Sequence, residues 1–257
     1  ILSKTDQKFI KERVKSSSRK NTKKIPLHVR FWKDREPTRP NYNAKWPEKA
    51  EALGEIEIDT VKEDEEKNEF IYQSPHYEFI SDVRLRLDVV KTFSKLFETT
   101  FEAMTLIPMS FDKARTSPPD HRYRVFLFAD IADYYKNGGP KGSGGVYMPR
   151  TDLIMIPLRS LGVKKKSGKY ALDYNYANQT LSHELVHQLM DNSYYKHGAL
   201  GWFTEGMAEY VSSSPYVYGR FTFRSNISTI KRSITAFDPK TRTGSNLGKK
   251  IKFSNLK

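Results

Sequence analysis

The chain has 257 residues, of which 37% are hydrophobic and 13% aromatic, and this length and composition suit one large domain with a sizeable core. Its lack of cysteine excludes disulfides and thiolate metal ligands, and the lack of any apolar run near 18 residues excludes a membrane-spanning helix. The net charge of +14 is concentrated at the two ends, with +10 in residues 1–50 and +7 in residues 201–257.

The first part of the chain, residues 1–75, is expected to form a basic segment with a small strand-rich region. Residues 1–24 are rich in Lys and Ser, and we interpret them as a solvated tail, although a basic end can also bind nucleic acid or an anionic surface. Residues 25–32 predict an edge strand. Residues 55–59 and 69–72 predict a hairpin with an acidic tip.

Residues 76–215 show the succession of strands and helices expected of one α+β domain. Residues 77–81 and 122–128 predict strands, and the second has few polar positions, which favours a central place in the sheet. Between them, apolar residues recur every three or four positions over 90–104 and predict a long helix. A short helix is expected over 131–135.

A glycine-rich stretch opens a pair of predicted strands at 142–148 and 153–157. It matches a phosphate-binding loop poorly, because neither a Lys-Ser/Thr pair nor a helix follows it. A flexible loop and an edge strand beside a catalytic site are the other two interpretations, and we favour the edge strand. The run Lys164–Lys166 predicts a solvated loop, or a loop that lines a cleft for acidic peptides.

The most specific pattern is His-Glu-Leu-Val-His at residues 183–187, within a predicted helix over 176–192. The spacing places His183 and His187 one turn apart on one helix face, so their ring nitrogens can converge on one ion. Glu184 is placed to reach a water on that ion. A surface helix with solvated side chains is the alternative, but leucines at i, i+4 and i+8 indicate that one side of the helix is buried.

A second helix-like run, Trp202–Tyr210, supplies Glu205 as a carboxylate ligand. Two histidines and one carboxylate leave a fourth position open, which distinguishes a catalytic zinc site from a closed structural one. The two helices must cross so that Glu205 faces the two histidines. We therefore expect Zn²⁺ as the cofactor.

The two runs resemble those of the gluzincin metallopeptidases. The second is similar to the Glu-Gly-x-Ala-Glu-Tyr segment of the aminopeptidase N family, and the order of elements is similar to that of small bacterial peptidase-MA-like proteins. The resemblance implies a zincin-like core, with a mixed sheet, a long backing helix and an active-site helix. It implies that His183, His187 and Glu205 bind zinc, that Glu184 is the general base, and that Glu209 orients a ligand histidine.

The resemblance also implies a substrate-binding edge strand, to which a peptide adds as a further strand. In this chain that strand would be Gly144, Gly145, Val146 and Tyr147. No Gly-x-Met-Glu-Asn segment is present, so endopeptidase activity is expected rather than aminopeptidase activity.

Gluzincins commonly stabilise the oxyanion with a Tyr or His from a later segment. Tyr216 and Tyr218 are the nearest later candidates, and Tyr195 and His197 lie in the loop between the two helices. Residues 216–257 form the basic C-terminal extension, with a strand-like stretch at its start and a short helix expected within 227–237.

The expected function is hydrolysis of peptide bonds in a peptide or protein substrate by a zinc-activated water. The alternatives are a zincin-like binding domain without turnover, and a basic protein that binds nucleic acid or an anionic surface. The intact Glu184 disfavours the first alternative, and the lack of any nucleic-acid-binding motif disfavours the second. We expect a monomer, secreted or located in the cell envelope, because similar bacterial proteins are mostly exported.

Overall fold

The computed structural model describes residues 41, 43–52, 54–109, 111–115, 121–149, 151–173, 179–190 and 201–223. The strand expected at 25–32, the helix expected within 227–237 and the two loop candidates Tyr195 and His197 lie outside the described residues.

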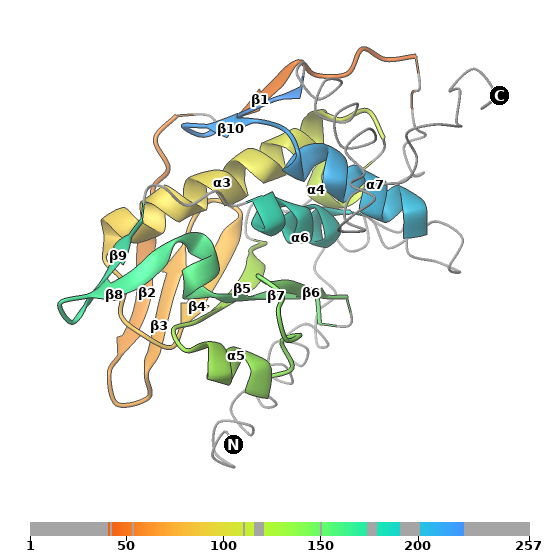
Figure 1. Cartoon of the computed structure of the whole chain (residues 1–257). Coiled ribbons are helices and arrows are strands. Elements are labelled where there is room, and N and C mark those ends of the chain that lie inside the picture. Colours follow the sequence, from red (N-terminus) through yellow and green to blue (C-terminus); the bar gives the residue numbers. More distant parts are fainter. Residues whose placement is uncertain are drawn as a thin grey trace, which may run out of the picture.

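A six-stranded mixed sheet forms the centre of the molecule (Figure 1). Its order is β2 (Asp59–Asp64), β3 (Glu69–Gln73), β4 (Tyr77–Ser81), β5 (Tyr123–Phe128), β7 (Leu153–Pro157) and β6 (Val146–Met148). β4, β5 and β7 run parallel, whereas β6 pairs antiparallel with β7 and forms one edge. The α+β class with a mixed sheet is thus confirmed. β2 and β3 come from before residue 76 and belong to the same sheet as β4, so the sheet extends across the boundary expected there.

The central strands bury both faces, as their composition predicts. In β5, Tyr123 and Leu127 belong to the main core under α3 (Leu87–Leu106), whereas Phe128 belongs to a smaller cluster with residues of α5 (Ile131–Lys136). The aromatic stripe of α3 is core, as expected. It packs edge-on against the sheet, with ring centroids 5.0–5.1 Å from that of Phe79.

Two shorter helices lie beside α3 on the same side of the sheet (Figure 1). α6 (Gln179–Leu189) packs against α3 and against β6, and α7 (Gly201–Ser212) packs against α6. Leu185 and Leu189 are fully buried, which confirms the buried side expected of the first motif helix. None of the helices in the described part of the chain combines the length and apolarity that a bilayer crossing needs.

A small second sheet covers the outer side of α3. It consists of β1 (Lys49–Glu51), β11 (Arg220–Thr222) and β10 (Tyr216–Val217). Phe221 of β11 is buried in the main core. β1 comes from before residue 76 and β11 from after residue 216, and the two strands pair here.

Two local predictions are corrected by turn geometry. The N-terminal hairpin begins at Asp59 rather than at residue 55, because the turn closes at Asn68, with φ of 47°, and an ion pair of 2.6 Å joins Lys62 to Glu69. The run Lys164–Lys166 is not a loop but part of β8 (Val163–Lys166), which pairs with β9 (Lys169–Leu172). Positive φ angles at the two intervening residues suit the two-residue turn of a hairpin.

The remaining short elements are α4 (Asp112–Arg115) and η1 (Leu158–Leu161).

Candidate metal centre

Three donor side chains from α6 and α7 converge at one point. The Nε2 atoms of His183 and His187 are 3.1 Å apart. The Glu205 carboxylate lies 3.2 Å from Nε2 of His183 and 3.4 Å from Nε2 of His187. These three residues form the group whose ligand atoms all lie within 4.8 Å of one another. The crossing of the two helices that the motif spacing required is therefore present.

Packing on the far side of each helix fixes this convergence. The four-residue spacing puts the histidines on one face of α6, and Leu185 and Leu189 occupy the opposite, fully buried face. In α7, Met207 and Val211 are buried. Successive residues of a helix are rotated by about 100°, so Glu205 lies on the side of α7 opposite to these two buried residues. This side faces α6.

Glu209 lies one helical turn after Glu205 and contacts the other nitrogen of the first histidine. Its Oε1 is 3.2 Å from Nδ1 of His183. A carboxylate at Nδ1 favours the tautomer that carries its proton on that atom, and this tautomer has its Nε2 lone pair available at the point of convergence. The structure thus places Glu209 where the resemblance implied an orienting carboxylate.

The spacing and the electrostatics of the cluster suit a divalent cation. Two ligands of a tetrahedral zinc ion lie about 3.3 Å apart, which is close to the separations found here. Burial lowers the pKa of the His187 imidazole, and the Glu205 carboxylate opposes this shift. The neutral imidazole favoured by burial is the form that ligates metals. The Glu205 side chain is 62% exposed, so the cluster opens to solvent on one side.

Glu184 is held between α6 and the sheet edge. Its Oε2 accepts a hydrogen bond of 3.0 Å from the backbone N–H of Tyr147 in β6. Burial raises the pKa of the Glu184 carboxyl, while this hydrogen bond and the nearby His183 act in the opposite direction. A carboxylate whose pKa is raised is better suited to accept a proton than an ordinary surface carboxylate.

The glycine-rich stretch lies where an edge strand was expected, but one glycine serves a different purpose. Val146 and Tyr147 belong to β6, and Gly144 and Gly145 directly precede it. A Cβ at Gly145 would lie 3.4 Å from the Met155 carbonyl oxygen and 3.8 Å from Cγ of Glu184. The lack of a side chain at Gly145 thus allows this segment to lie close to β7 and to Glu184. It was expected instead to allow a substrate backbone to approach.

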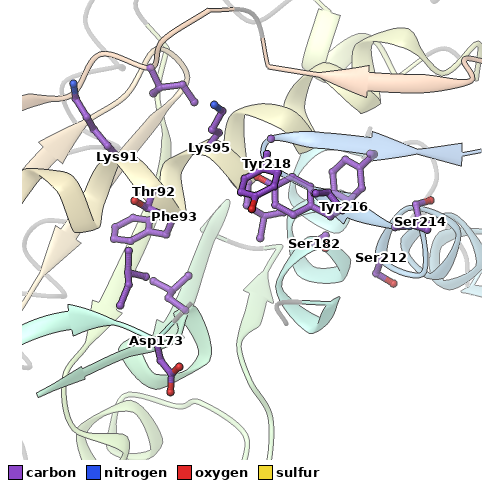
Figure 2. A pocket seen from close by; sticks show the side chains of 18 of the residues that line it. Lys91, Thr92, Phe93, Lys95, Asp173, Ser182, Ser212, Ser214, Tyr216 and Tyr218 are labelled. Carbon is purple, nitrogen blue, oxygen red and sulfur yellow. The ribbon is translucent and has the colours of Figure 1, made fainter. Parts of the chain in front are cut away.

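The structure does not bring Tyr216 or Tyr218 to the histidines. Both line a cavity of about 670 Å³ between α3, β9 and the β10–β11 turn (Figure 2). The Tyr216 hydroxyl forms hydrogen bonds with the Thr99 side chain and the Gly219 backbone, and burial raises its pKa to about 12. Tyr218 sits at the turn itself and is 93% exposed. The expected oxyanion role of these two tyrosines therefore finds no support in their placement.

The chain matches no protein-family model, no curated protein and no solved structure. These comparisons therefore neither support nor contradict the resemblance of the two motif runs to gluzincins, which stays a hypothesis. Function must be inferred from the chemistry of the site itself.

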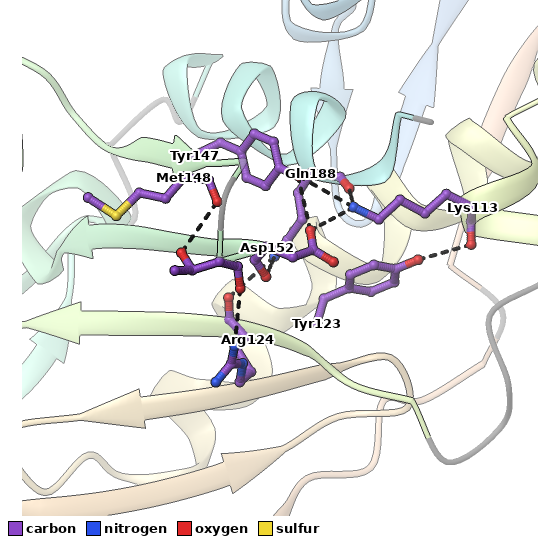
Figure 3. Close-up of polar contacts among 8 residues, drawn as sticks. Lys113, Tyr123, Arg124, Tyr147, Met148, Asp152 and Gln188 are labelled. Carbon is purple, nitrogen blue, oxygen red and sulfur yellow. Dashed lines mark hydrogen bonds and ion pairs between the residues drawn. The ribbon is translucent and has the colours of Figure 1, made fainter. Parts of the chain in front are cut away.

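A polar network next to the cluster escaped the sequence-based interpretation. It joins Lys113, Tyr147, Asp152 and Gln188, which come from four separate segments (Figure 3). No motif marks Lys113, Asp152 or Gln188, and Tyr147 was expected only as part of the edge strand. The one available signal was the turn between two predicted strands, where Asp152 adopts a φ of 50°.

Proposed function

We propose that this protein is a zinc-dependent peptidase with a zincin-like core, in which His183, His187 and Glu205 hold the ion. The observation that carries the proposal is the convergence of these three donor atoms from two helices. Two imidazoles and one carboxylate form the ligand set of catalytic zinc sites, and the exposed side of Glu205 leaves room for a reactant.

The architecture around the cluster is consistent with this proposal. A long helix, α3, backs the sheet, α6 carries the first motif, and an antiparallel edge strand, β6, contacts α6. The resemblance to gluzincins implied a mixed sheet, a long backing helix and an active-site helix, and this arrangement supports the proposal. They make the fold suitable for peptide hydrolysis without identifying a family.

When bound, the ion supplies a Lewis acid that acidifies water and polarises a carbonyl group. Glu184 then acts as the general base: its carboxylate accepts the proton of the attacking water and passes it to the leaving amine. The hydrogen bond from the Tyr147 N–H to Oε2 limits the rotation of the Glu184 carboxylate. In the proposed reaction the other carboxylate oxygen, Oε1, accepts the proton of the water.

The substrate is proposed to be a peptide that binds along β6, the strand at this end of the sheet. Tyr147 pairs directly with Ile154 of β7, yet its N–H points to Glu184 rather than into the ladder. Main-chain groups of alternate residues in β6 therefore face away from β7. A peptide that adds to this edge would pass beside Glu184. An internal segment of a protein can bind in this way as well as a chain end can, which favours endopeptidase activity.

Metal analysis combined with digestion of a peptide library tests the proposal. We expect one zinc per chain and cleavage that Glu184→Gln abolishes without loss of the metal. A protein that binds one zinc but never cleaves would instead be a binding domain. A metal-free protein whose DNA binding weakens steeply with salt would support the basic-protein alternative.

A further inference from the structure

Lys113 ties three separate elements together beside the metal-binding cluster. Its Nζ lies 2.6 Å from Oδ1 of Asp152 in the β6–β7 turn, donates to the main-chain carbonyl of Gln188 in the last turn of α6, and lies 3.5 Å from the Tyr147 hydroxyl (Figure 3). The Lys113 side chain is 13% exposed. A nearly buried ammonium with several oxygen partners forms strong, directional contacts.

The position of this ammonium relative to α6 has an electrostatic reason. The last carbonyls of a helix lack intrahelical partners and carry the negative end of the helix dipole, so a cation there is stabilising. Gln188 directly follows the ligand His187. Its side-chain Nε2 adds bonds of 3.3 Å to the carbonyls of Arg124 and Asp152. The end of α6 is thereby fastened to β5 and to the β6–β7 turn.

Tyr147 connects this fastening to the proposed general base. Its hydroxyl donates a hydrogen bond of 3.0 Å to Oδ1 of Asp152, the same oxygen that Lys113 binds. Its backbone N–H donates to Glu184. A continuous chain of contacts therefore runs from Lys113 through Asp152 and Tyr147 to the Glu184 carboxylate, and a second branch runs from Lys113 to the end of α6.

We propose that Lys113 is a positioning residue that sets the separation between α6 and β6, and through it the place of the Glu184 carboxylate. The role in turnover rests on the proposed peptidase function, whereas the role in fixing β6 does not. Because Tyr147 contacts Glu184 directly, whereas Glu205 comes from α7, the network should affect the base and the strand more than metal affinity.

The test compares Lys113→Met with Lys113→Arg in the full chain. We expect Lys113→Met to speed the hydrogen exchange of the Tyr147 amide at least tenfold by NMR, and to leave the Val125 amide in β5 unchanged. In the zinc-loaded protein kcat should fall by about 10- to 100-fold, because displacements near 1 Å have such effects, while zinc affinity stays within about threefold. Lys113→Arg keeps the charge and should recover most of both losses.

Asp152→Asn carries the test if Lys113→Met does not fold, because Asn tolerates the left-handed backbone of residue 152 and removes only the charge. Lys164→Met, which breaks the exposed pair with Asp173, is the matched control and should change neither reading. Wild-type exchange at Tyr147 and wild-type kcat in Lys113→Met or Asp152→Asn would overturn the proposal. Equal acceleration at Val125 would also overturn it, since it reports global destabilisation. A protein without zinc or cleavage rejects the peptidase function, yet the amide exchange still tests the positioning role.

Discussion

The backbone N–H of Tyr147 donates a 3.0 Å hydrogen bond to the Glu184 carboxylate, across 37 positions of sequence. Glu184 is therefore carried by α6 but oriented by β6. This contact places the carboxylate between the edge where we propose that a peptide binds and the cluster of His183, His187 and Glu205. A helix residue that faced solvent freely would lack this restraint.

Glu184→Gln separates proton transfer from metal binding. The amide has the same shape and its oxygen still accepts from Tyr147, so zinc content and thermal stability should match the wild type. Because the amide cannot take a proton, kcat should fall by roughly 10²- to 10⁴-fold. The measurement is single-turnover cleavage of a substrate peptide by zinc-loaded protein. Turnover above a tenth of wild type would remove Glu184 as the base.

His187→Ala should abolish both metal binding and cleavage, because two donors hold zinc much less tightly than three. Metal that binds only the folded state raises its stability. Added zinc should thus raise the Tm of the wild type but not that of His187→Ala. The control is His121→Ala, which changes an exposed histidine outside the cluster. If zinc raises the Tm of all three proteins equally, the ion binds elsewhere.

Glu209→Ala should weaken zinc affinity by about tenfold, since loss of the carboxylate at Nδ1 frees the His183 ring to rotate and to change tautomer. Glu209→Gln is the matched control. Its side-chain oxygen can still accept from Nδ1, so its affinity should remain within about threefold of wild type. Competition with a chromogenic chelator measures both. Identical affinity in Glu209→Ala and wild type would make Glu209 an ordinary surface residue.

Asp82 should make the folded state less stable as pH rises. Burial raises its pKa from 3.8 to about 6, and the N–H of Ala129 and the charges of Asp133 and Asp130 modify the shift. The folded chain binds this proton more tightly than the unfolded chain, so the stability contributed by neutral Asp82 is full below about pH 4 and is lost as pH rises through about 6. The loss is on the order of 2–3 kcal/mol.

Asp82→Asn isolates this effect, because its side-chain oxygen still accepts from Ala129 and cannot ionise. Denaturant unfolding of both proteins from pH 4 to 7 should show the difference in unfolding free energy growing in favour of Asp82→Asn. Asp82→Ala, which removes the acceptor, should be less stable than Asp82→Asn at every pH. A difference between wild type and Asp82→Asn that does not change with pH would contradict the raised pKa.

Local periodicity was enough to predict the elements that carry the site. Leucines four residues apart predicted the buried side of α6, and the aromatic stripe over residues 90–104 predicted α3 as the helix that backs the sheet. The strand at 77–81 agrees with β4 residue for residue. Such features depend on which side of one element is apolar, and that information is contained in neighbouring residues.

Contacts between distant segments could not be predicted in the same way. The stretch around residue 56 alternates like a strand, but hairpin pairing was decided by the turn at Asn68. Tyr216 was selected as the next tyrosine along the chain, yet the pairing of β10 with β11 points its hydroxyl at α3. Lys113 carries no motif at all, since its role comes from a side-chain contact with the carbonyl of Gln188, 75 positions away.

The most direct test of the central claim is an anomalous difference map at the zinc edge from crystals grown with one equivalent of zinc. We expect one strong peak within about 2.0–2.2 Å of Nε2 of His183, Nε2 of His187 and a carboxylate oxygen of Glu205. A map with no peak among these atoms, or with Glu205 turned toward solvent, would contradict the metal centre and the peptidase proposal with it.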